Sequence, residues 1–184
     1  MVIIDRLKEE HQAILLMLQV LEAVCKKLEI GEDVNKDDLY KMVDFIKIYA
    51  DKSHHHKEED LLFPAMVEAG IPKEGGPIGV MLAEHTMGRN FVQGMNQALE
   101  EFSTGSADSS SKIVSNARGY VELLTDHIYK EDNILYPMAE MHISDEKHSE
   151  LLKEFEQVEP DKIGEEKHNE MVDNLNELKE IYLS

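Results

Sequence analysis

Four long stretches of the chain place apolar residues three and four positions apart, the spacing that lines one face of an α-helix. In the first stretch the recurring positions are Ile4, Leu7, His11, Ile14, Leu18, Leu21, Cys25 and Leu28. In the second they are Leu39, Val43, Ile46, Ala50, His54, Glu58 and Leu61. In the third they are Ile78, Met81, His85, Gly88, Val92, Met95, Leu99 and Phe102. In the fourth they are Ile113, Ala117, Tyr120, Leu124, His127, Glu131, Ile134 and Met138. We therefore expect four long helices, each with one buried face.

Short segments rich in turn-forming residues separate these stretches, at 31–35, 70–77 and 104–108. Gly31 is expected to end the first helix, and Pro64 to kink the second helix or break its last turn. Long amphipathic helices joined by short connections are typical of antiparallel neighbours. The pattern predicts an all-α, up-down-up-down four-helix bundle over residues 1–141.

Residues 142–184 are expected to form an appendage of two further helices. Ser144 is in place to cap the first helix, and Pro160 and Gly164 separate it from the second. Their apolar positions are Leu151, Leu152, Phe155 and Val158, then Met171, Leu175, Leu178 and Ile181. We interpret this as a C-terminal helical hairpin that packs on the bundle or on a second subunit, which would make the protein a homodimer.

Composition narrows the class of protein. Of the 184 residues, 42% are hydrophobic and 31% are charged, which suits a helical core with a solvated exterior. A formal charge of −19 argues against nucleic acid and anionic membranes as partners. Cys25 is the single cysteine, so no disulfide can form within the chain. The first residues lack a signal-like apolar run, and no stretch approaches the roughly 20 apolar residues of a membrane span. We expect a cytoplasmic protein.

Six ionisable residues occupy positions in the apolar seams, namely His11, His54, Glu58, His85, His127 and Glu131. Burying an unpaired charge costs several kcal/mol, so these side chains must meet one another, a metal or both. His11 and His54 each lie about 18 residues from the first predicted turn, and His85 and His127 each lie about 18 residues from the third. In antiparallel helices the four histidines therefore lie at one level.

The chemistry is also repeated within the chain. HHHKEEDLLFP at 54–64 aligns without a gap on HIYKEDNILYP at 127–137, and Glu10-His11 corresponds to Glu84-His85. Both copies contain His-x-x-x-Glu, which places an imidazole and a carboxylate on one helix face. The repeat predicts a pseudo-twofold axis through a site to which each half gives two histidines and one glutamate.

Nitrogen and oxygen donors without thiolate suit iron, manganese or zinc, and two bridging glutamates suit a dinuclear centre. The Glu-x-x-His spacing of ferritin-like bundles does not occur in the repeat, which argues against a ferritin-type site.

Residues 1–140 resemble a hemerythrin-like domain of the HHE cation-binding type. The resemblance rests on EEH at 9–11, the two repeat motifs, and the GGPI-x-x-ML-x-EH-x-x-GR run at 75–89. It implies two non-haem iron ions joined by an oxo or hydroxo bridge inside the bundle. Carried over by position, the implied metal ligands are His11, His54, Glu58, His85, His127 and Glu131.

One position departs from the oxygen-carrying members of that family. They have a fifth histidine four residues after the third-helix histidine, where this chain has Arg89. Four histidines, two bridging carboxylates and one bridging oxygen leave two of the twelve positions around two six-coordinate irons open. This favours a di-iron protein that binds or reacts with O₂, peroxide or nitric oxide in a redox or stress role, supplied by an electron-donor protein. The alternative is an O₂ carrier or an O₂/iron sensor without turnover.

Several neighbouring residues leave alternatives open. His55 with Glu59, and His56 with Asp60, offer other registers for the His-x-x-x-Glu pair, and His55 and Glu59 could instead orient the ligands. Asp132 competes with Glu131 as the bridging carboxylate. Arg89 is expected to pair with Glu84 or Glu10 or to face a bound anion. The tyrosines considered near the ligand level are Tyr49, Tyr120 and Tyr129, and the histidines expected to lie outside the site are His142, His148 and His168.

Overall fold

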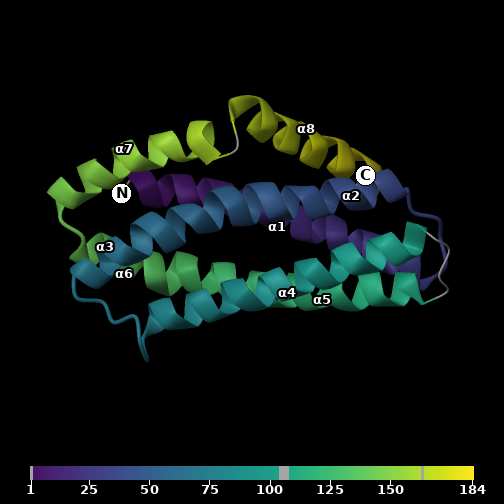
Figure 1. Cartoon of the computed structure of the whole chain (residues 1–184), viewed down its shortest axis with the longest axis horizontal. Coiled ribbons are helices and arrows are strands. Elements are labelled where there is room, and N and C mark those ends of the chain that lie inside the picture. The colour runs from purple at the N-terminus through teal and green to yellow at the C-terminus, as the bar shows by residue number, and fades with distance from the viewer. Residues whose placement is uncertain (1, 104–107, 163) are drawn as a thin grey trace.

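A computed structural model of the chain describes residues 2–103, 108–162 and 164–184. Four antiparallel rods form the bundle (Figure 1). The first rod is α1 (Val2–Glu29) and the third is α4 (Pro77–Ser103). The second rod consists of α2 (Lys36–Phe45), η1 (Ile46–His55), η2 (Lys57–Leu62) and α3 (Phe63–Glu68). The fourth consists of α5 (Ser109–Lys130), η3 (Glu131–Leu135) and α6 (Tyr136–His142). The predicted all-α, up-down-up-down bundle is confirmed.

Local hydrogen bonds explain where the first two rods meet. Gly31 has a φ of +77°, which a glycine adopts without strain, and the N–H of Glu32 donates to the carbonyl of Lys27 at 2.9 Å. The Asn35 side chain then accepts a hydrogen bond from the N–H of Asp37 and caps α2. The predicted turn after Gly31 is thus confirmed, whereas the turn predicted at 104–108 lies outside the described residues except for Asp108.

The second and fourth rods widen into π-helical turns within the repeated motif. The N–H of Phe63 donates to the carbonyl of Glu58, and that of Tyr136 donates to the carbonyl of Glu131, each five residues back. A proline without an N–H follows in each copy, and the rod continues through Pro64 to Glu68. Of the two expectations for Pro64, a kink or a break, the break is wrong, because the backbone had already left the α register and the rod continues.

The π-helical turns also shift which residues face the core. Leu61 and Ile134 were expected in the buried seams, but Leu61 is only half-buried and Ile134 is 50% exposed. The next residues, Leu62 and Leu135, are buried instead, at 0% and 1% exposed. Each π-helical turn holds more residues than an α-helical turn, so the buried position moves on by one residue in both copies.

The core consists of two apolar clusters, one on each side of a polar layer. The first includes Ile14, Leu21, Val43 and Leu99, and the second includes Ile4, Leu7, Leu62 and Leu135. His11 lies in α1 between Leu7 of one cluster and Ile14 of the other. The bundle therefore holds its polar side chains in a layer covered by apolar side chains on both sides.

Two C-terminal helices cover the face formed by the first two rods. Ser144 caps the helix α7 (Asp145–Lys162), and its hydroxyl accepts from the N–H of Lys147 at 3.3 Å, as predicted. The helix α8 (Glu165–Tyr182) follows, and Figure 1 shows α7 and α8 along successive halves of the bundle. Phe155 of α7 joins one apolar cluster and Leu175 of α8 joins the other, so both helices pack on the bundle itself.

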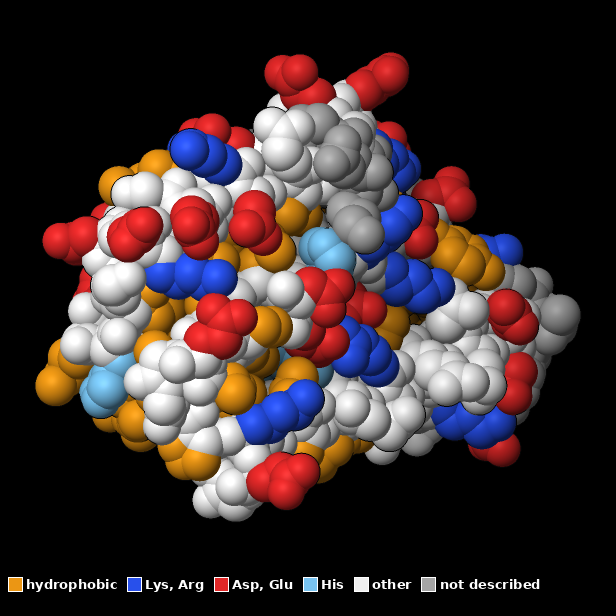
Figure 2. Space-filling view, turned by 60° about the vertical axis from the view of Figure 1, so that its left-hand side comes forward, with side chains coloured by type: hydrophobic (Ala, Val, Ile, Leu, Met, Phe, Trp, Pro, Cys, Tyr) orange, Lys and Arg blue, Asp and Glu red, His pale blue; other side chains and the backbone are white. Residues whose placement is uncertain are grey.

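The exterior is charged. Figure 2 shows acidic side chains spread over one face, with lysine and arginine side chains among them. Within the described ranges, none of the helices is both long and apolar enough to span a membrane.

Candidate metal centre

The six ionisable residues predicted from the seams meet in the polar layer. Each has an exposure of 1% or less: His11, His54, Glu58, His85, His127 and Glu131. They come from all four rods, as antiparallel packing at one level requires. The structure thus brings the whole predicted set together, while their role as metal ligands stays a prediction.

The two glutamates lie between imidazoles from different helices. The Glu131 carboxylate approaches Nε2 of His127 at 3.0 Å and Nε2 of His11 at 3.2 Å. Glu58 Oε2 lies 3.4 Å from Nε2 of His85 and 3.7 Å from Nε2 of His54. Each carboxylate therefore faces one histidine of its own rod and one of another rod, the arrangement that a bridging ligand needs.

Three carboxylate oxygens in this layer have no hydrogen-bond partner, namely Glu58 Oε2 and both oxygens of Glu131. Burying such an oxygen without a donor costs about 1–3 kcal/mol, and more when it is charged. The neighbouring imidazole nitrogens lie close to these three oxygens but do not form hydrogen bonds with them. Lone pairs that converge on one place from several sides fit a cation, so these residues suit a metal ion.

Two groups of donors share this layer. The first consists of His11, His54, Glu58 and Glu131, and the second of His55, Glu58, His85 and His127. Within each group the donor atoms lie within 4.8 Å of one another, and every member is buried. Glu58 belongs to both groups, which suits two metal ions bridged by a carboxylate. Nitrogen and oxygen donors without thiolate are compatible with iron, manganese or zinc.

Each of the five imidazoles has its Nδ1 on a carboxylate. The pairs and their distances are His11–Asp132 at 2.8 Å, His54–Glu10 at 2.8 Å, His55–Asp51 at 3.3 Å, His85–Glu59 at 2.7 Å and His127–Glu84 at 2.9 Å. A carboxylate that accepts the Nδ1 proton fixes the tautomer and the ring orientation, and it leaves Nε2 free to bind a metal.

These pairs follow the internal repeat. Lys57 donates to Glu10, the partner of His54, at 2.5 Å. Lys130 donates in the same way to Glu84, the partner of His127. The predicted pseudo-twofold relation therefore extends beyond the histidines to the residues that orient them.

The pKa values of the histidines in the layer are shifted in opposite directions. Burial lowers the pKa of His11, but the hydrogen bond that Asp132 accepts from its Nδ1 and the negative charges of Glu131 and Glu58 outweigh burial and raise the pKa to about 9. Burial likewise opposes protonation of His127, yet the Glu131 charge raises the pKa to about 10. For His54 burial prevails and lowers the pKa to about 3.

The same balance acts on Glu131. Burial alone would raise the pKa of this carboxyl group, but the charges of His127 and His11 hold it well below its usual range. Without metal, protons on these two imidazoles therefore compensate an ionised Glu131.

Two residues of the layer were not predicted as part of the site. His55 was treated as an alternative register or an orienting residue, but its ring faces the layer because the π-helical turns bring two consecutive histidines inward. Tyr136 was not considered. Its hydroxyl donates to Glu58 Oε1 at 2.6 Å and lies 3.3 Å from His11 Nε2. The signal for Tyr136 was in the repeat, where the equivalent residue, Phe63, has no hydroxyl.

The structure also places the residues that were weighed as alternatives. Arg89 pairs with Asp51 and Glu59 rather than with Glu84 or Glu10, because those two glutamates already bind lysines. Among the described histidines and carboxylates weighed as alternatives, those that lie outside both donor groups are Asp132, Glu59, His56, Asp60, His142, His148 and His168.

Comparison with known proteins agrees with this geometry. The family described as hemerythrin HHE cation-binding domain matches residues 2–139. The chain is 30% identical over 89 residues to iron-sulfur cluster repair protein YtfE of Yersinia pseudotuberculosis serotype IB (strain PB1/+), and equally to that of Yersinia pestis (strain Pestoides F). The aligned part is 47% of this chain and 40% of each relative, so the chain spans less than half the length of these relatives. No solved structure matches the chain.

Proposed function

The chain belongs to the hemerythrin HHE cation-binding domain family, and on that premise we propose that its bundle holds two non-haem iron ions that bind or react with O₂, peroxide or nitric oxide. The observation that carries this proposal is the set of buried carboxylate oxygens without hydrogen-bond partners, enclosed by imidazole nitrogens. His11 and His54 would hold one ion, His85 and His127 the other, and Glu58 and Glu131 would lie between them. Bound iron would supply the redox centre.

The residues of the chain define how such a centre works. The two apolar clusters exclude bulk water from the layer, and the Nδ1 carboxylates keep the imidazoles oriented. Tyr136 places an O–H group at Glu58 Oε1, where it can donate a hydrogen bond within the layer. These features favour a small external ligand, such as a diatomic molecule or peroxide, because the layer leaves little room.

The relatives suggest a biological setting. They are named iron-sulfur cluster repair proteins, and we extend this to a stress role for the present chain. Because the aligned part is 40% of their length, repair activity is the more remote part of the proposal. An electron-donor protein would be needed for repeated turnover. A carrier or sensor would use the same layer without turnover.

The test is reconstitution with Fe²⁺ under anaerobic conditions, followed by metal analysis and an absorption spectrum after oxidation. We expect about two irons per chain and oxo-bridge absorption bands. Fewer than one iron per chain without such bands would overturn the proposal. The reduced protein is then mixed separately with O₂, peroxide and nitric oxide. Sustained consumption supports a redox enzyme, whereas a reversible adduct supports the carrier alternative.

Matched variants show whether the right residues were chosen. Replacing Glu131 by Gln should lower iron content, because the bridging charge is lost. His168→Ala is the control, since His168 stacks on Tyr49 outside both donor groups. Full iron retention in Glu131→Gln would show that the layer does not hold the metal as proposed.

A further inference from the structure

His55 belongs to the second donor group, but the function proposed above gives it no metal to bind. Its side chain is 3% exposed, and its ring stacks on that of His85 with centroids 3.9 Å apart. The ring of His127 lies edge-on at 6.1 Å. His55 thus lies beside the two imidazoles assigned to one metal ion, and its donor atom belongs to their group with Glu58.

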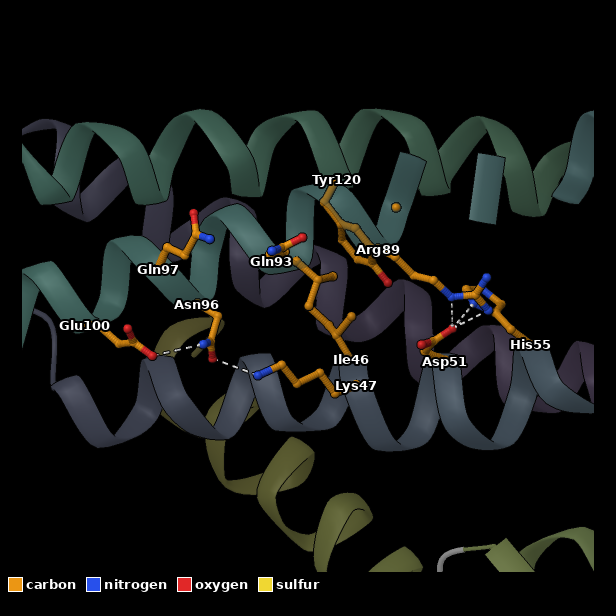
Figure 3. A pocket seen from close by; sticks show the side chains of 12 residues that line it. Ile46, Lys47, Asp51, His55, Arg89, Gln93, Asn96, Gln97, Glu100 and Tyr120 are labelled. Atoms are coloured by element: carbon orange, nitrogen blue, oxygen red, sulfur yellow. Dashed lines mark hydrogen bonds and ion pairs between the residues drawn. The ribbon is translucent and has the colours of Figure 1, made fainter. Parts of the chain in front are cut away.

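Two residues outside the layer fix the orientation of the His55 ring. Asp51 takes its Nδ1 at 3.3 Å, and Arg89 binds Asp51 at 2.7 Å. Figure 3 shows Arg89 reaching from α4 to Asp51 beside His55, along a pocket of about 490 Å³. Arg89 also binds Glu59 at 2.8 Å, the carboxylate that orients His85. One guanidinium therefore connects the two carboxylates that orient two neighbouring rings.

We propose that His55 is a fifth imidazole ligand, on the same metal ion as His85 and His127. This rests on the proposed di-iron function. A histidine ligand needs one ring nitrogen held by a partner and the other placed among further donors, and Asp51 meets the first condition at Nδ1 of His55. The convergence of the His55 donor atom with those of Glu58, His85 and His127 meets the second.

The fifth imidazole changes what the centre can bind. One ion then has three imidazoles and the other has two, from His11 and His54. With both glutamates bridging, one coordination position stays open instead of two, and it lies on the ion of His11 and His54. An external ligand therefore has one place to bind, on the side of the layer where Tyr136 places its hydroxyl.

Azide is a suitable probe, because it binds open positions on oxidised iron and gives a charge-transfer band. The wild type should bind one azide per iron pair. His55→Ala should bind two, and added imidazole should restore one by taking the place of the missing ring. His56→Ala is the matched control: its neighbouring ring points to Asp60 and is 21% exposed, so this variant should behave as wild type.

A second measurement needs no substitution. In the Co²⁺-loaded wild type, each ligating imidazole gives one strongly shifted, exchangeable N–H signal in the proton NMR spectrum. Five such signals support the proposal, and four overturn it. This count decides the matter even if His55→Ala folds poorly. His55→Gln, which keeps a polar side chain of similar size facing Asp51, provides a second variant for the azide titration.

The outcomes separate this inference from the proposed function. A wild type that loads no iron overturns both. A wild type that loads two irons, together with a His55→Ala variant of unchanged azide stoichiometry and spectrum, overturns only the role of His55. A His55→Ala variant that binds two azide ions per iron pair, with His56→Ala still binding one, supports it.

Discussion

Removing the Tyr136 hydroxyl tests how the bundle tolerates its buried carboxylates. Tyr136 and Glu58 are both 0% exposed, and the hydroxyl donates to Glu58 Oε1 at 2.6 Å. Tyr136→Phe removes this donor and leaves no other change of shape. A hydrogen bond to a charged group contributes about 1.5–3 kcal/mol, so the metal-free protein should lose about that much free energy of unfolding. For a chain of this length the midpoint of thermal unfolding should fall by about 3–12 °C.

Iron should reduce this effect. In the loaded protein the Glu58 oxygens have a cation as partner, so we expect Tyr136→Phe to cost less than half as much. Thermal and urea unfolding, followed by circular dichroism with and without iron, measure both values. Tyr120→Phe is the control, because Tyr120 is equally buried and makes no hydrogen bond to Glu58 among the described residues. If the two metal-free variants lose the same stability, the carboxylate does not depend on the hydroxyl and the reasoning is refuted.

Three further predictions address orientation, charge and packing. Glu84→Gln should weaken iron binding about 10–100-fold without unfolding the protein, because Glu84 orients His127. Equilibrium titration with iron measures the affinity, and Glu101→Gln is the control. Equal iron affinities of Glu84→Gln and the wild type would contradict this prediction. Metal binding at pH 7 should release about two protons, because the pKa values of His11 and His127 are about 9 and about 10 and both rings must be neutral to bind. The affinity for metal should thus fall about a hundredfold per pH unit on acidification below pH 9. Calorimetry in two buffers counts the protons released on metal binding. A count near zero would contradict the assignment of His11 and His127 as metal ligands. Burial raises the pKa of Cys25 to about 11. A disulfide reagent at pH 8 should therefore label the folded chain at least about a hundredfold more slowly than the urea-unfolded chain. Similar labelling rates for the two would show that the core opens readily.

The helical period of the sequence was sufficient to predict the bundle and the set of six residues. Every seam position predicted in α1 is buried, from Ile4 to Leu28. A strictly α-helical period was also the source of the errors. It assigned one inward position where the π-helical turns supply two, and so it placed His54 in the buried seam and left His55 as an alternative register or an orienting residue. The displaced positions Leu61 and Ile134 have the same cause.

The orienting residues were harder to predict, because they depend on contacts between rods. Glu10 and Glu84 were noted as matching positions, but only the packed structure shows that each binds the histidine of another rod. Arg89 was assigned to the wrong carboxylates for the same reason, since Asp51 and Glu59 become its neighbours only when the second rod packs beside α4. Spacing along one helix carries no information about such pairs.

The central claim is that two metal ions hold the polar layer together. The most direct measurement is an anomalous difference map, recorded at the iron absorption edge, from crystals of the iron-loaded protein. The account predicts two peaks inside the bundle, with Glu58 and Glu131 between them, His11 and His54 at one peak, and His85 and His127 at the other. A map without a peak in this layer, or with a single peak bound by only one of the two donor groups, would contradict it.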